Sequence, residues 1–246
     1  MLWALATLGI SPDPAWLQQH LREVGRRQAQ RTLLPQHLAN VGWALAKLSH
    51  RPDRDWLAKY QEDVLAALPG FKPQEISNVL WALAVLNCKA EQVGGGPAVC
   101  VRGARMQGFS AQELSTLAVS LARLEYRPPQ AWLDSFAAAA AEQLGNFGAQ
   151  ALANTLWALA TLHYTPHEDW MAAFDTQLQR HVTSCTPAHV AMTMWAMSTL
   201  QWLPQQPLWQ QLQERAELHS ASYCLRSQRM LSRAVRVLEK VEADDE

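Results

Sequence analysis

Polar side chains return at a fixed step along this 246-residue chain, at positions suited to hydrogen bonding with a ligand. The first clear set is His37, Asn40, Ala44 and Lys47, whose spacing places all four on one helical stripe about 80° wide. Equivalent positions recur four more times, each with a small residue among mostly polar neighbours. This pattern predicts a binding surface. Its candidate residues are His37, Asn40, Lys47, Glu75, Asn78, Glu113, Thr116, Arg123, Asn154, Thr161 and His189.

The same side chains also have a structural explanation. One asparagine per repeat, as at Asn40, Asn78 and Asn154, can form a ladder of hydrogen bonds to neighbouring backbone, because buried amides need partners. The imidazole and cationic members of the stripe can equally be solvated surface residues. The tryptophans of a recurring Trp-Ala-Leu motif are predicted to lie in the core. The glutamines that open each segment are predicted to cap helices, and they are Gln36, Gln74, Gln112 and Gln150.

Basic residues gather in two further places. The first cluster is Arg22, Arg26, Arg27 and Arg31. In the second cluster the residues step by three and four positions, which places them on one face of a helix. Like charges on one face repel, so this stripe predicts either contact with phosphate groups or a solvated helix that caps the fold. The second cluster consists of Arg226, Arg229, Arg233, Arg236 and Lys240.

The sequence contains no residue pattern typical of catalysis. There is no Gly-rich phosphate loop, no His-Glu-x-x-His segment and no nucleophile elbow. The four cysteines form no Cys-x-x-Cys pair, and no set of ligands completes a zinc site. We therefore expect neither an enzyme nor a bound cofactor or metal, and no small-molecule substrate.

A repeat of 38 residues organises these positions. The Trp-Ala-Leu motif or a close relative places its reference residue at positions 3, 43, 81, 119, 157 and 195. A second motif, Trp-Leu, and a third, a Pro-Gln or Ala-Gln element, keep the same step. Three motifs in one register indicate a repeat protein.

Each repeat is predicted to contain two helices. Prolines and acidic residues open the first helix, called helix A, and the Pro-Gln element opens helix B. Helix B is apolar nearly all round, so neighbouring repeats must cover it. The predicted fold is all-α, a right-handed-type α-solenoid of about six helix–turn–helix units in residues 1–205. Capping helices are expected over 206–241 and an acidic tail over 242–246. The third unit is degenerate, because Gly94, Gly95, Gly96 and Pro97 oppose a helix A. Either a loop replaces helix A over 89–105, or the sequence itself is irregular there.

Composition narrows the class of protein further. Apolar residues make up 49% of the chain and charged residues 17%, which is typical of a folded protein. No apolar run reaches the length of a membrane span. The net charge is −1, and residues 1–241 carry +3 because four acidic residues lie in 242–246. This small excess of basic residues excludes a protein that binds nucleic acid by electrostatic attraction alone.

The repeat resembles the octotricopeptide repeat, a helical-repeat family of green-algal organelles. The resemblance rests on residues 147–162 (Phe-Gly-Ala-Gln-Ala-Leu-Ala-Asn-Thr-Leu-Trp-Ala-Leu-Ala-Thr-Leu) and 128–133 (Pro-Pro-Gln-Ala-Trp-Leu), and it extends over about residues 1–205. It implies binding of single-stranded or ribosomal RNA in a mitochondrion or chloroplast. The implied roles are transcript stability, splicing, translation, or stabilisation of ribosomal RNA. No transit peptide is visible, so localisation rests on the resemblance alone.

The resemblance also gives the recurring side chains a specific interpretation. Modular RNA readers present two or three side chains to each base, as the stripe of helix B does. Stacking of bases on the tryptophans is the alternative to their predicted core role. Other proteins of a ribonucleoprotein complex are expected partners, and no membrane is. The competing function is a protein-binding scaffold, since α-solenoids commonly bind peptides or proteins along one face.

Overall fold

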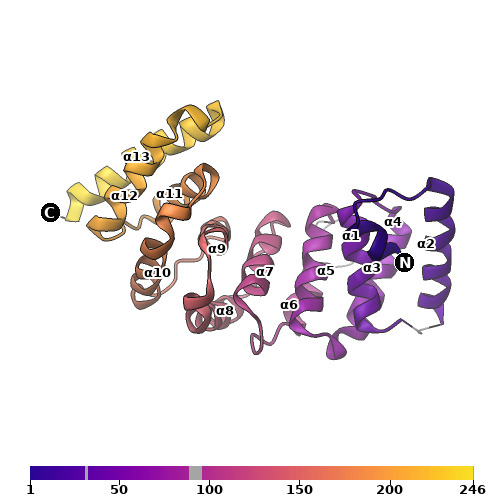
Figure 1. Cartoon of the computed structure of the whole chain (residues 1–246). Coiled ribbons are helices and arrows are strands. Elements are labelled where there is room, and N and C mark those ends of the chain that lie inside the picture. Colours follow the sequence, from indigo (N-terminus) through magenta and orange to yellow (C-terminus); the bar gives the residue numbers. More distant parts are fainter. Residues whose placement is uncertain (31–32, 89–95, 246) are drawn as a thin grey trace. The chain divides into compact units, whose positions relative to one another are not determined.

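The computed structural model describes residues 1–30, 33–88 and 96–245, and it is helical (Figure 1). The side chains of Arg226 and of residues 242–245 lie outside this description, as does Arg31. No strand occurs in the described ranges. The prediction of an all-α helical repeat solenoid is therefore confirmed.

The helices alternate between the two predicted kinds. Helices A are α2 (Pro14–Ala29), α4 (Arg54–Ala67), α6 (Gly96–Gly103), α8 (Gln130–Gln143), α10 (Glu168–His181) and α12 (Gln206–Leu218). Helices B are α1 (Leu2–Thr7), α3 (Pro35–Lys47), α5 (Pro73–Val85), α7 (Ala111–Arg123), α9 (Ala149–Thr161), α11 (Pro187–Leu200) and α13 (Leu225–Asp245). Short 3-10 turns, η1 (Leu68–Gly70), η2 (Leu144–Asn146), η3 (Val182–Ser184) and η4 (Ser220–Ser222), follow four of the helices A.

The 38-residue step extends to the last helix. Helices B from α3 to α13 begin at residues 35, 73, 111, 149, 187 and 225, each 38 residues after the one before. Helix α12 likewise begins 38 residues after α10. Residues 206–245 therefore have the order and spacing of another repeat, although Arg233 stands where the reference tryptophan would be.

The third repeat contains a shortened helix A, which corrects the expectation of no helix there. Segment 89–95 lies outside the described residues, and α6 begins at Gly96 with Pro97 in its first turn. Amide N–H groups in the first turn have no partner within the helix. A proline, which has no N–H, therefore loses no hydrogen bond there and can begin a helix. Buried Cys100 and Val101 anchor α6, which packs against α4 and α5.

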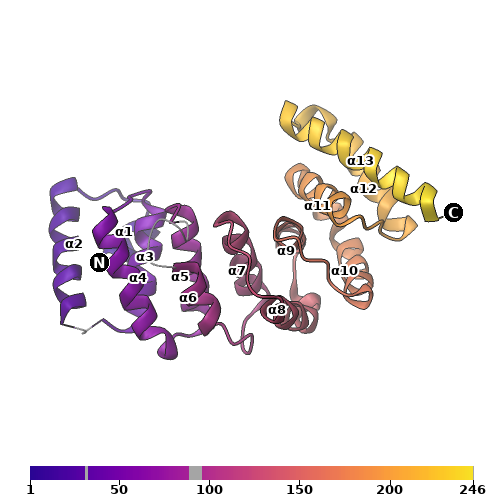
Figure 2. The same cartoon turned by 180° about the vertical axis from the view of Figure 1, so that it is seen from behind.

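The chain divides into two compact units. Unit 1 comprises residues 1–108 and 123–128, and unit 2 comprises 109–122 and 129–246. Within unit 1, α3 packs between α1 and α5 (Figure 1). Within unit 2, α11 packs between α9 and α13, as the reverse view also shows (Figure 2). Helices B thus cover one another's flanks within each unit.

Helix B ends in the same way in each repeat. Six residues after the reference position the backbone is left-handed, with φ between 52° and 68°. In all of these repeats but the one that contains Glu125, the next residue donates its amide N–H to the carbonyl five positions earlier, for example His50 to Leu45 at 2.9 Å. This hydrogen bond closes a Schellman turn. Only the first of these left-handed residues is a glycine, and the set is Gly9, Ser49, Asn87, Glu125, His163 and Gln201.

Candidate functional site

The face of helix B that is exposed in the structure is rotated about the helix axis relative to the stripe predicted from the sequence. Four residues of each helix B from α3 to α11 are exposed or half-buried: the reference residue, those seven and three positions before it, and the one four positions after it. At 100° per residue they fall within about 60° of one another. We call this set the helix-B stripe. In unit 1 it consists of Gln36, Asn40, Trp43 and Lys47 on α3 and of Gln74, Asn78, Trp81 and Val85 on α5.

The other helices B present equivalent stripes. These are Gln112, Thr116, Val119 and Arg123 on α7, Gln150, Asn154, Trp157 and Thr161 on α9, and Ala188, Met192, Trp195 and Thr199 on α11. The small residue predicted at the centre is not among them. That position is at most 1% exposed in each helix, and its occupants are Ala44, Ala82, Ser120, Ala158 and Ala196. It faces the flank where helices B pack, as Ala82 does towards Gly42 of α3.

The reference tryptophans lie on the stripe, which corrects their assignment to the core. Trp3 is 49% exposed, and Trp43, Trp81, Trp157 and Trp195 are half-buried. In unit 1 they contact one another across repeats. The ring centroids of Trp3 and Trp43 are 6.4 Å apart, and those of Trp43 and Trp81 are 6.3 Å apart.

The asparagines form no ladder. In the described part of the chain, the half-buried side chains of Asn40, Asn78 and Asn154 make no hydrogen bond to protein groups. The ladder interpretation is therefore wrong. Each amide lies beside a reference tryptophan and keeps two donors and an acceptor for another partner.

Four predicted binding residues instead cap helices. His37 and His189 accept a hydrogen bond through Nδ1 from the backbone N–H of Leu34 and Thr186, both at 3.3 Å. Glu75 accepts one from the amide of Lys72 at 2.8 Å. Glu113 does the same for Ser110 at 2.8 Å. These side chains satisfy the free N–H groups that precede each helix, and the glutamines predicted to be caps are exposed instead.

The remaining predicted members of the stripe are of two kinds. Thr161 donates its hydroxyl to the carbonyl of Trp157 at 2.8 Å, so one of its hydrogen-bonding groups is already used. Lys47 and Arg123 are exposed and belong to no ion pair among the described residues. Thr116 is half-buried beside Val119. The cations therefore remain the strongest candidates in this group.

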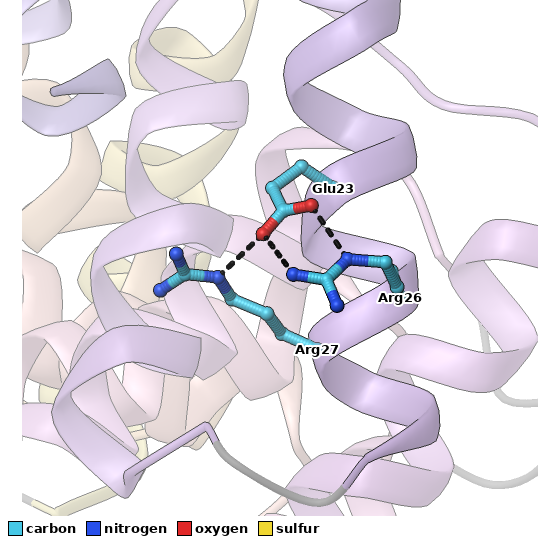
Figure 3. Close-up of polar contacts among 3 residues, drawn as sticks. All are labelled: Glu23, Arg26 and Arg27. Atoms are coloured by element: carbon cyan, nitrogen blue, oxygen red, sulfur yellow. Dashed lines mark hydrogen bonds and ion pairs between the residues drawn. The ribbon is translucent and has the colours of Figure 1, made fainter.

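The arginines of α2 are partly neutralised by an acidic residue that the charge pattern did not single out. Glu23 bridges Arg26 and Arg27 with three hydrogen bonds of 2.8 Å (Figure 3). Hydrogen bonds from both guanidinium groups lower the pKa of Glu23 to about 2. Arg22 is exposed and lines a cavity of about 530 Å³ together with Arg51 and Trp56.

The basic face of α13 keeps its charge. Arg229, Arg233, Arg236 and Lys240 are exposed. They form no ion pair in the described part of the chain, and Arg236 donates Nε–H only to the carbonyl of Ser232 at 3.1 Å. The prediction for Arg226 lies outside the described side chains. Unpaired cations on one face favour an anion.

Other kinds of site find little support among the described residues. No group of three or more His, Cys, Asp or Glu side chains there is arranged to hold a metal ion. No described helix is long and apolar enough to cross a membrane. One buried acid stands out in unit 2, where burial raises the pKa of Asp175 to about 7. Its Oδ2 accepts the amide of Gln205 at 3.2 Å, which is a structural contact between α10 and the loop before α12.

Residues 34–201, more than half of the chain, match the family described as the Tbc2 translation factor, N-terminal domain. The matched region begins just before α3 and ends just after α11, so it contains five of the reference positions. No curated protein matches the chain.

Proposed function

The chain belongs to the family of the Tbc2 translation factor N-terminal domain, and we propose that it binds single-stranded RNA in an organelle through the helix-B stripe. The organelle and the class of RNA rest on the resemblance to the octotricopeptide repeat. The 38-residue step of the helices supports that resemblance. In this proposal the protein acts by binding RNA and not by catalysis. The process it serves is translation, another step of RNA metabolism, or the stabilisation of ribosomal RNA in a ribosome.

One observation carries the proposal. Asn40, Asn78 and Asn154 stand at the same position of the stripes on α3, α5 and α9, with no protein partner among the described residues. An asparagine amide pairs with the edges of single-stranded bases, which offer both donors and acceptors. Because these amides are only half-buried, water can satisfy them, and a base edge that displaces this water keeps their hydrogen bonds.

The small number of exposed cations on the helix-B stripe and on α13 is consistent with RNA binding in which the protein contacts only a few phosphates. Lys47 and Arg123 lie on the stripe, and α13 adds Arg229, Arg233 and Arg236. Along α13 the cations from Arg229 to Lys240 extend over about 16 Å at 1.5 Å per residue, enough to follow several phosphates. Phosphate contacts position a strand without reading its sequence. In this proposal the stripe contacts bases and α13 contacts the backbone.

The test of base contact is a double variant, Asn40→Ala with Asn78→Ala. RNA enriched from a random pool by the wild-type chain is the probe, and affinity is measured by fluorescence anisotropy. We expect about tenfold weaker binding, because two hydrogen bonds to bases are lost. Gln179→Ala, which removes an exposed amide from helix A, is the control and leaves binding unchanged. Equal binding by the double variant, or no binding by the wild-type chain, contradicts the proposal.

The test of phosphate contact is the salt dependence of binding. Each phosphate neutralised on a single strand contributes about −0.7 to the slope of log affinity against log salt. Replacing Arg229, Arg233 and Arg236 with Gln is expected to flatten that slope by up to about 2, with the same preferred sequence. An unchanged slope identifies the basic face of α13 as a solvated surface or a surface for an acidic protein.

A further inference from the structure

Three tryptophans of unit 1 form a column on the surface. Trp3 of α1, Trp43 of α3 and Trp81 of α5 contact in series, with interplanar angles of 40° and 32°. These separations lie within the range of contacting aromatic pairs. Each ring comes from a different repeat, so the packing of helices B sets the column. We call Trp3, Trp43 and Trp81 the tryptophan column.

The column is partly exposed to solvent. Trp3 is 49% exposed, and Trp43 and Trp81 are half-buried. None of the three indole N–H groups donates to a protein group in the described ranges. Large aromatic side chains with one solvent-exposed face are typical of binding surfaces, because they bury apolar area when a partner binds.

The residues around the column indicate what the partner is. On α3 and α5 the stripe adds the amides of Asn40 and Asn78, two exposed glutamines and Lys47, and it contains no carboxylate. Trp3 and Asn40 also line a cavity of about 410 Å³, to which Arg27 and its ion-pair partner Glu23 contribute. The backbone of a hydrophobic peptide could pair with these amides, but such a peptide would offer no anion to Lys47. Flat bases joined by phosphates would use the rings, the amides and the cation together.

We propose that the tryptophan column is a stacking platform for consecutive bases of a single strand. This inference rests on the proposed function and specifies how unit 1 contributes to it. Stacking on an aromatic ring tolerates any base, because every base has a π face. Unit 1 therefore binds any base but binds purines more strongly than pyrimidines, because larger rings stack more strongly, while Asn40 and Asn78 bond to base edges.

The decisive experiment compares ligands that differ in their bases at constant charge. Affinities of the full chain are measured for oligoadenylate, oligouridylate and an abasic ribose-phosphate oligomer of equal length. The wild-type protein is expected to bind them in that order. The double variant Trp43→Leu with Trp81→Leu is expected to bind oligoadenylate at least about tenfold more weakly. Its affinity for the abasic oligomer and its salt slope stay at the wild-type values.

Two controls separate stacking from loss of structure. Trp56→Leu removes a half-buried tryptophan of helix A, whose ring stacks on Tyr60 at 5.4 Å, and it leaves the adenine preference intact. Trp43→Phe with Trp81→Phe keeps aromatic faces and retains most of the preference. Thermal unfolding of each variant verifies its fold.

A second measurement needs no substitution. Oligouridylate carrying 5-iodouridine is crosslinked by light to the wild-type chain, and the crosslinked peptides are sequenced. Crosslinks at Trp43 or Trp81 support the platform even where the leucine variants fail to fold. Crosslinks confined to α2 or α13 overturn it.

The outcomes distinguish the two proposals. Wild-type binding with an unchanged adenine preference in the leucine variant overturns the platform and leaves the proposed function standing. Failure of the wild-type chain to bind any of the three oligomers, or the pool-selected RNA, overturns both. In that case the column is better explained as a docking surface for a protein.

Discussion

Tryptophans occur in both kinds of helix at the same 38-residue step, yet their rings have different neighbours. In helices A the ring stacks on an aromatic residue four positions later in the same helix, as Trp170 does on Phe174 at 5.2 Å. Trp170 is only 6% exposed, and its Nε1–H donates to the carbonyl of Ala137 at 3.1 Å. In helices B of unit 1 the ring instead contacts the equivalent ring of the next repeat in a tilted arrangement, on the surface.

The difference lies in what each ring contact depends on. A contact within one helix, such as Trp170 with Phe174, anchors its own repeat whatever the neighbours are. A contact between repeats, such as Trp43 with Trp81, exists only when the repeats stack, and it builds a continuous surface. The recurrence of tryptophan alone does not distinguish these roles.

The largest expected effect tests this contrast directly. Trp170→Ala removes a buried ring and its hydrogen bond, and we expect a loss of about 3–5 kcal/mol in the free energy of unfolding. Trp157→Ala on the stripe of α9 is expected to cost less than half as much, because the ring is already partly solvated. Denaturant unfolding measures both, with Gln179→Ala as an exposed control. Equal losses would contradict the contrast.

A pH-dependent effect comes next and concerns the inward face of helix A. Asp175 on α10 has its pKa raised by burial from the ordinary 3.8 to about 7. Between these values the folded protein holds a proton that the unfolded chain has released, so this residue makes stability fall as pH rises from about 4 to about 7. Asp175→Asn is expected to stabilise the protein by about 2–3 kcal/mol at pH 8 and by little below pH 4. An equal gain at both pH values would show that the carboxyl is not desolvated.

The contact between helix A and helix B can be disturbed with one methyl group. A Cβ on Gly42 of α3 would overlap the ring of Tyr60, whose hydroxyl donates to the carbonyl of Leu38 at 2.9 Å. Tyr60 is fully buried, so Gly42→Ala is expected to cost about 1–2 kcal/mol. Gly145→Ala is the matched control, because a Cβ there meets no atom within 4 Å. Similar melting temperatures for the two variants would show that the tyrosine moves aside freely.

The smallest expected effect concerns the end of helix B. Gln201 holds a left-handed backbone, with φ of 52°, that glycine adopts without steric cost. Gln201→Gly is therefore expected to stabilise the protein by about 0.5–1 kcal/mol. The same change at exposed Gln179, inside α10, is expected to destabilise it by about 1 kcal/mol. Thermal unfolding of the pair tests both signs.

The site was predicted in part from the sequence. Helical spacing identified Asn40, Asn78, Lys47 and Arg123 as residues of one face, and the structure places them there. The spacing did not show that the outward face is centred near the tryptophan. A stripe about 80° wide fits an outward face centred on the tryptophan as well as one centred on the small residue. The capping role of Glu75 had a sequence pattern of its own, an acidic residue in the first turn after a proline.

The sequence by itself determined the repeat, its length, its two helices and the all-α fold, because periodicity and helix-breaking residues act locally. Even α13 could have been placed from the 38-residue step, despite Arg233 at its reference position. Only the tertiary structure decided which residues face outward. Ala82 is buried because it packs against the neighbouring helix B, and Trp81 is only half-buried, with its ring in contact with Trp43. Such contacts join residues about 40 positions apart, and no local pattern specifies them.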